Sequence, residues 1–188
     1  MNNNLSAFTL DELLKEVKER EVKEVYIEHD DIKFKDIPPM THADCVKYAT
    51  SYMDKRYNVV FPEFYCWNAE LPDVIAFSNR SSAVIECKVS RSDFIKDRQK
   101  PFRRNPNSGM GDARYYCCPK GLIKPDELPY GWGLLYVSPN GTIRKQVESH
   151  GNFKKNKDAE YHLLFYYARR AYNAGVHKVV LEYRGFDK

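Results

Sequence analysis

The stretch LPDVIAFSNRSSAVIECKVSRSDF, from Leu71 to Phe94, decides the fold prediction because it embeds three charged residues in apolar, strand-like sequence. These residues are Asp73, Glu86 and Lys88. A buried charge is costly unless a partner compensates it, and a metal ion is one such partner. Side chains alternate along a strand, so Glu86 and Lys88 should share one face while Cys87 points to the other. If the two apolar runs pair as an antiparallel hairpin around SNRSS, Asp73 lies beside Glu86 and Lys88.

The sequence around this hairpin predicts an α/β (α+β) protein with a central mixed sheet flanked by helices. The break IPPM divides the chain into an N-terminal extension, 1–40, and a domain, 41–188. In the extension we expect a helix from about 10 to 21 and a short hairpin. The domain should contain, in order, helix 41–56, strands 58–66, 72–78 and 82–89, helix 91–99 ended by Pro101, strand 113–118, hairpin 132–147, helix 158–175 and strand 177–183. The apolar face predicted for the last helix consists of Leu164, Tyr167, Ala168 and Ala171.

Composition narrows the class of protein. The chain has 188 residues, enough for one domain with its own core. No apolar run approaches the roughly 20 residues of a membrane span, and the start does not read as a signal peptide. The five cysteines lack C-x-x-C spacing, so we expect reduced thiols in a cytoplasmic protein rather than a zinc site. No glycine-rich phosphate loop is present, so we expect no nucleotide cofactor.

Charge is distributed unevenly along the chain. Residues 1–40 carry six basic and ten acidic side chains, 91–104 carry six and two, and 144–157 carry five and one. Two basic segments in an otherwise neutral chain indicate a surface that faces a polyanion, and solvated surface is the alternative for either segment alone. The acidic extension is a candidate element for homodimerisation or for docking a protein partner.

The predicted cluster of two carboxylates and one amine suits a hard divalent cation. Mg²⁺ takes oxygen ligands and is typically held by one or two carboxylates, together with water and substrate phosphate. Asp73, Glu86 and the backbone carbonyl of Cys87 are the candidate ligands. Lys88 would orient or help deprotonate the attacking water, or offset charge on the phosphate. The chemistry indicated is metal-assisted hydrolysis of a phosphodiester.

Asp73, followed after twelve residues by Glu86-Cys87-Lys88, resembles the signature of the PD-(D/E)XK nuclease superfamily. The order of elements over 41–118 is similar to the restriction-endonuclease-like core of that superfamily. The stretches IECKVSRSDFIKDRQKPFR, RYYCCPKGLI and DELPYGWGLLYV are similar, more specifically, to small bacterial and phage MmcB-like proteins associated with DNA repair. The resemblance covers about residues 41–145.

This resemblance implies a metal-dependent nuclease, with DNA favoured over RNA, in phage, mobile-element or repair biology. It implies Asp73 and Glu86 as metal ligands, Lys88 as the catalytic lysine, and Mg²⁺ as the cofactor with Mn²⁺ able to substitute. Members of the superfamily often carry another acidic residue on the first core helix. Asp44 is the candidate there, and Glu63 on the first strand is the second candidate.

Basic residues that follow the signature are expected to contact phosphate, and a tyrosine beside them can stack on an unpaired base. The residues expected to bind nucleic acid are Arg91, Lys96, Arg98, Lys100, Arg103, Arg104, Arg114 and Tyr115. The alternative interpretation is a binding module without catalytic activity, in which the same fold holds nucleic acid or a protein partner.

Overall fold

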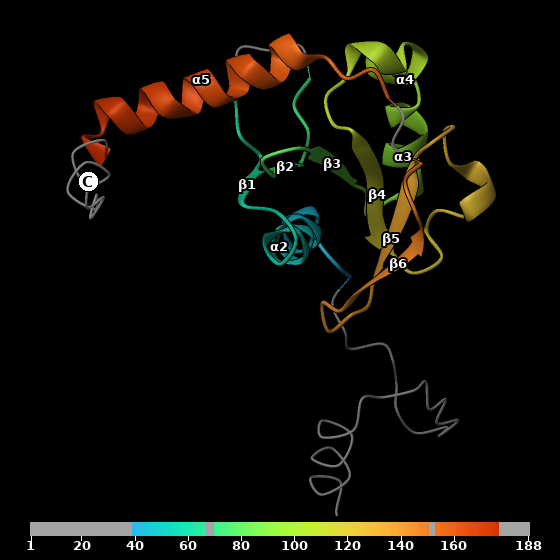
Figure 1. Cartoon of the computed structure of the whole chain (residues 1–188). Helices are drawn as coiled ribbons and strands as arrows, with labels where there is room; N and C mark the ends of the chain where they lie inside the picture. Colours follow the sequence, from blue (N-terminus) through green and yellow to red (C-terminus); the bar gives the residue numbers. More distant parts are fainter. Residues whose placement is uncertain (1–38, 67–69, 151–152, 177–188) are drawn as a thin grey trace, which may run out of the picture. The chain divides into compact units, whose positions relative to one another are not determined.

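The computed structural model describes residues 39–66, 70–150 and 153–176 (Figure 1). The chain divides into two units, Met1–Pro38 and Pro39–Lys188, and every described residue belongs to the second. The helix and hairpin predicted for the extension, and the strand predicted at 177–183, lie outside the described residues.

The domain contains a six-stranded mixed sheet whose strands lie side by side in chain order. The strands are β1 (Val59–Pro62), β2 (Val74–Phe77), β3 (Ser82–Cys87), β4 (Ala113–Pro119), β5 (Gly133–Val137) and β6 (Ile143–Val147). The pairs β1–β2, β2–β3 and β5–β6 are antiparallel, whereas β3–β4 and β4–β5 are parallel. A parallel pair requires a crossover connection, and the segment between β3 and β4 supplies one that carries helices. The predicted mixed sheet flanked by helices is confirmed.

The helices begin where the sequence offers caps. Helix α2 (His42–Asp54) begins with a capping box in which the Thr41 hydroxyl and the Asp44 carboxylate each bond the other residue's backbone N–H. Helix α3 (Arg91–Asp97) is capped by Ser90. Pro101 does not simply end this helix, as predicted, but opens a second one, α4 (Pro101–Arg104), because proline fits the first turn of a helix. Short 3₁₀ turns follow at η2 (Pro106–Ser108) and η3 (Pro125–Glu127).

Strand alternation assigns the two faces of β3 to different layers. Ile85 and Cys87 pack in a buried cluster with α2. Cys87 thus points to the face opposite Glu86, as the sequence predicts. Val84, on the other face, packs in a cluster with Leu163 of α5 (Lys157–Asn173). Figure 1 shows α2 and α5 on opposite sides of β1–β3. Glu86 therefore points away from α2, like Val84.

A buried polar cluster joins α5 to the sheet, and we call it the clamp: Ser82, Gly111, Asp112, Lys155 and Glu160. Glu160 Oε1 accepts hydrogen bonds from the Ser82 hydroxyl at 2.6 Å and the Gly111 N–H at 2.9 Å. Asp112 Oδ2 accepts from the Ser82 N–H at 2.8 Å, and Lys155 Nζ lies 2.7 Å from it. Lys155 also pairs with Glu160 at 3.1 Å.

The predicted apolar face of α5 is wrong. Leu164 and Tyr167 are 39% and 46% exposed, whereas the buried side chains of the helix are Glu160 and Leu163. The helix carries aromatic and aliphatic residues on several sides, so helical spacing alone does not select the buried stripe. No helix in the described segments is both long enough and apolar enough to cross a lipid bilayer.

Candidate functional site

The β2–β3 hairpin brings Asp73 to Glu86. Val74 pairs with Ile85 in the antiparallel register, so Asp73 lies opposite Glu86. The Cys87 N–H donates a hydrogen bond to Asp73 Oδ2 at 2.7 Å, which fixes that carboxylate at the end of β3. The predicted neighbourhood of Asp73 and Glu86 is confirmed.

Lys88 lies between the carboxylates. Its Nζ is 2.8 Å from Glu86 Oε2, 3.7 Å from Asp73 Oδ2 and 3.5 Å from Asp97 Oδ1. Burial by itself would lower the pKa of Lys88, but the nearby carboxylates, Glu86 first, outweigh burial and leave that pKa raised. Lys88 is therefore a protonated ammonium group at neutral pH in this arrangement, able to donate a hydrogen bond but not to accept a proton.

The positive charge near Asp73 does not compensate for its burial and for the negative charge of Glu86. Burial raises its pKa, the negative charge of Glu86 raises it further, and Lys88 and the Cys87 N–H oppose this only in part. Two carboxylates that face each other in a partly buried place favour the arrival of another cation. The Asp73 side chain is 20% exposed and that of Glu86 is 2% exposed, so Asp73 is the carboxylate of this pair that solvent can reach.

Glu86 is held by three cations. Lys88 and Lys100 contact Oε2 at 2.8 and 3.0 Å, and Arg103 Nη2 contacts Oε1 at 3.2 Å. Glu86 itself is 1% exposed. Within the segments described, its hydrogen bonds and ion pairs come from these side chains and none from a backbone N–H or a hydroxyl.

Asp97 completes this arrangement from α3, and sequence reasoning missed it. It accepts a hydrogen bond from the Tyr116 hydroxyl at 2.6 Å and pairs with Lys100 at 2.8 Å and Arg103 at 2.7 Å. Burial opposes its ionisation, but Arg103 and Lys88 more than compensate and lower the pKa of Asp97. The sequence predicts a basic helix over 91–99, and only the path of the crossover shows that Asp97 turns inward.

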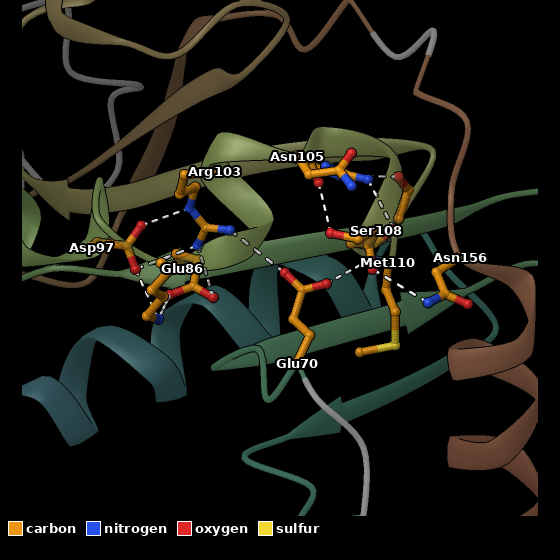
Figure 2. Close-up of polar contacts among 12 residues, drawn as sticks. Glu70, Glu86, Asp97, Arg103, Asn105, Ser108, Met110 and Asn156 are labelled. Carbon is orange, nitrogen blue, oxygen red and sulfur yellow. Dashed lines mark hydrogen bonds and ion pairs between the residues drawn. The ribbon is translucent and has the colours of Figure 1, made fainter.

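Glu70 lies at the far side of Arg103, as Figure 2 shows. Glu70 Oε1 is 3.5 Å from Arg103 Nη1, and Oε2 accepts from the Met110 N–H at 2.5 Å. Burial raises the pKa of Glu70. We call the whole set the acidic network, and its members are Glu70, Asp73, Glu86, Lys88, Asp97, Lys100 and Arg103. Four carboxylates thus meet three cations in direct contact.

The two candidates for a further acidic ligand differ in position. The Asp44 carboxylate bonds the Thr41 N–H and hydroxyl at 3.1 and 2.6 Å, so it serves the helix cap. Glu63 Oε1 and Asp73 Oδ1 each lie 3.5 Å from the same atom, His42 Nε2. Glu63 also has a φ of 43°, a conformation that is strained for a residue with a side chain. The geometry therefore favours Glu63 over Asp44, and it adds His42, which sequence reasoning did not assign to the site.

The predicted nucleic-acid contacts fall into groups. Lys96, Arg98, Lys100 and Arg104 are exposed, but Lys100 also pairs with Glu86 and Asp97 of the acidic network. Arg91 is exposed but is paired with Glu127 at 2.5 Å and donates to the Leu122 carbonyl.

Three of the predicted contacts are wrong in position. The Arg103 side chain is 2% exposed and forms ion pairs with the buried carboxylates of Glu86 and Asp97. Arg114 is fully buried and donates to the backbone carbonyls of Gly109 and Gly111. Tyr115 packs with the α2 cluster, on the opposite face of the sheet from Tyr116, and donates to Glu148. The presence of a basic or aromatic residue in a predicted strand does not show on which face of the sheet its side chain lies or how deeply it is buried.

The donor set fits a hard cation in type. Asp73 and Glu86 offer carboxylate oxygens and Cys87 offers a carbonyl oxygen, which are ligands that Mg²⁺ and Mn²⁺ accept, with water and phosphate completing the shell. The raised pKa of Asp73, caused by burial and then by Glu86, indicates that the pair would gain from added positive charge. Lys100, at 43% side-chain exposure, can leave Glu86 more easily than Lys88 can, at 8%.

Two hollows, of about 430 and 290 Å³, lie at the other end of α2 and share Tyr52 and Arg56. Neither is lined by a member of the acidic network. The chemistry of the carboxylates, rather than the depth of a cavity, therefore defines the candidate site.

Comparison with known proteins supports the fold alone. No family model and no curated protein matches the chain. A solved structure, the SPO1766 protein of unknown function from Silicibacter pomeroyi, is similar with a TM-score of 0.54 and 18% sequence identity. The match covers 79% of this chain and 99% of that one. The described domain is thus an α+β fold with a six-stranded mixed sheet, shared with a protein whose function is itself unknown.

Proposed function

We propose that this protein is a metal-dependent nuclease of the PD-(D/E)XK type, acting on DNA. The observation that carries the proposal is the placement of Asp73 opposite Glu86 across the β2–β3 hairpin, with Lys88 Nζ within 3.7 Å of both carboxylates. A helix, three antiparallel strands, a helical crossover and a parallel strand are also the order expected of a restriction-endonuclease-like core. A role in phage, mobile-element or repair biology is part of the proposal and rests on the sequence resemblance.

Each residue has a distinct role in this mechanism. Asp73, Glu86 and the Cys87 carbonyl would hold Mg²⁺ or Mn²⁺, with Glu63 nearby as a further acid. A bound ion supplies Lewis-acid activation of water and phosphate. Lys88, charged and fixed by three carboxylates, would donate to phosphate oxygens as negative charge develops on them. The exposed Lys96, Arg98 and Arg104 would hold the sugar-phosphate backbone by charge.

The test is cleavage of a mixed panel: plasmid, linear duplex, single-stranded DNA and RNA, each with Mg²⁺, Mn²⁺ or EDTA. We expect metal-dependent cutting of DNA that falls by on the order of 1000-fold in Lys88→Ala, since that variant loses the charge that faces the phosphate. Lys55→Ala, at an exposed lysine that caps the C-terminal end of α2 and has no place in the proposed site, is the matched control and should retain cutting. Equal activity in Lys88→Ala and the parent chain would exclude the proposed mechanism.

A binding module without catalysis is the second candidate. Its supporting observation is that Glu86 is already neutralised by Lys88, Lys100 and Arg103, so the site is stable without a metal ion. In that case the panel would be bound in a salt-sensitive manner but not cut with either metal ion. Asp73→Asn and Glu86→Gln would then leave binding unchanged.

A further inference from the structure

Three cysteines from separate elements meet behind the acidic network. They are Cys45 of α2, Cys87 of β3 and Cys117 of β4, and their sulfur atoms all lie within 4.8 Å of one another. Cys87 and Cys117 are direct partners in the parallel β3–β4 register, and α2 places Cys45 over the pair. All three are at most 1% exposed and none forms a disulfide.

The spacing of the three sulfurs suits a shared metal ion. Sulfur ligands lie about 2.3 Å from Zn²⁺, so three of them around one ion are about 4 Å apart. The 4.8 Å limit on the distances between the three sulfur atoms is within about 1 Å of this spacing. In the described part of the chain no histidine, aspartate or glutamate joins the three within the same distance.

We propose that Cys45, Cys87 and Cys117 form a binding site for a thiophilic d¹⁰ metal ion, with three sulfur donors favouring Cu(I) over Zn(II). Soft thiolates select Cu(I) and Zn, whereas structural Zn sites nearly always have four ligands. The surrounding side chains are apolar, including Ile85 and Leu135, so the site offers hard ions no carboxylate ligand.

The two faces of β3 would then bind different classes of metal ion, a hard ion on one face and a thiophilic ion on the other. Glu86 carries oxygen donors to one face and Cys87 carries sulfur to the other. The Cys87 N–H also holds Asp73 Oδ2, so fixing the Cys87 side chain to a metal ion would steady the backbone that positions Asp73. The thiol site does not depend on the nuclease proposal, because its ligands and its test are separate.

The test is metal retention by the full chain, refolded under reducing, oxygen-free conditions with Cu(I) or Zn²⁺, because the buried site would fill most readily as the chain folds. We expect one ion per chain after desalting and a higher unfolding temperature with metal than without. Competition with a chelator should show affinity reduced on the order of 100-fold or more in Cys45→Ser. Cys118→Ser is the matched control, since Cys118 is also fully buried on β4 but faces the other cluster.

X-ray absorption of the loaded parent chain tests the ligands without any variant. A first shell of sulfur alone, at about 2.3 Å, supports the site; a shell with nitrogen or oxygen overturns it. Absence of retained Cu(I) and Zn²⁺ also overturns it and would mean that the thiols pack only as small apolar groups. So would equal loss of affinity in Cys118→Ser and Cys45→Ser. If Cys45→Ser fails to fold, Cys117→Ala provides the same comparison.

Discussion

The clamp and the acidic network are both buried clusters of charge, yet they are held in different ways. In the clamp, backbone N–H groups and a hydroxyl bond the carboxylates of Asp112 and Glu160, and one lysine bridges the two. In the acidic network, the central carboxylate, Glu86, is bonded by the ends of three long cationic side chains. Fixed donors belong to the fold, whereas a lysine such as Lys100 can move away into solvent.

The difference shows how a folded chain can keep a charged site available. Both clusters contain more carboxylates than cations in direct contact, so the count of charges does not separate them. What separates them is whether a donor can leave without unfolding the chain. Glu86 can exchange the mobile Lys100 ammonium group for a metal ion, whereas the Gly111 N–H and the Ser82 hydroxyl cannot leave Glu160.

The largest expected contrast comes from removing the central acid of each cluster. Glu160→Ala should lower the free energy of unfolding by roughly 3 kcal/mol, because the Gly111 N–H and the Lys155 ammonium lose a buried partner. Glu86→Gln should cost less, about 1 kcal/mol, because Lys100 can turn to solvent while Lys88 and Arg103 keep Asp97 as a partner. Urea denaturation with EDTA present measures both. Equal losses would mean that the acidic network is as rigid as the clamp.

The next contrast concerns Lys100 as a competitor of the metal ion. Lys100→Gln should raise the affinity for Mn²⁺ by about tenfold, since one of the two ammonium groups at Glu86 Oε2 and Asp97 Oδ1 is removed. Calorimetric titration with Mn²⁺ gives the affinity directly. Lys96→Gln, at an exposed lysine of the neighbouring helix α3, should leave it unchanged. An unchanged or weaker affinity in Lys100→Gln would contradict the idea that this lysine occupies the place of a cation.

The smallest contrast concerns the direction in which pH changes the stability contributed by one aspartate of each cluster, Asp73 and Asp112. Burial and then Glu86 raise the pKa of Asp73, so the stability that its protonated form contributes is lost as pH rises above the usual aspartate value of 3.8. Although burial opposes it, Lys155 and Ser82 lower the pKa of Asp112, so its contribution is present above 3.8 and is lost as pH falls. At neutral pH, Asp73→Asn should stabilise the chain by about 1 kcal/mol.

Asp112→Asn should destabilise it by about 0.5 kcal/mol, less because solvent screens this partly exposed group. Unfolding temperatures of both variants and the parent chain, followed from acid to neutral pH, give the two signs. The same sign in both variants would remove the distinction between the clusters.

The part of the site that lies on one hairpin could be predicted from the sequence. Alternation puts Glu86 and Lys88 on one face, and hairpin pairing brings Asp73 to them, since both rules act between near neighbours. Glu70, Asp97 and Arg103 could not be found in this way. They reach the site through a turn and a crossover. Glutamate, aspartate and arginine are common on protein surfaces, so their residue types do not indicate a buried site until the path of the chain is known.

Arg114 and the buried face of α5 are two positions at which the local sequence pattern gives the wrong environment. Arg114 stands in a basic, tyrosine-rich stretch that favours a surface role, but its guanidinium is buried beside Gly109 and stacks on Phe153. The clamp buries Glu160, an acidic residue, on the inner side of α5, where spacing rules expect apolar side chains. In both cases a tertiary partner overrides what the local pattern favours.

The matching of strand order to chain order has a consequence for how the domain assembles. Every strand pairs with its neighbours in sequence, so no pairing has to span an intervening strand, which limits the loop entropy that each closure costs. The β2–β3 hairpin can close before the crossover is in place, and Asp73 and Glu86 would then meet while Arg103 and Lys100 are still distant. Lys88 follows β3 directly, so it would offset the repulsion between the two carboxylates at that stage, before the proposed chemistry uses its charge.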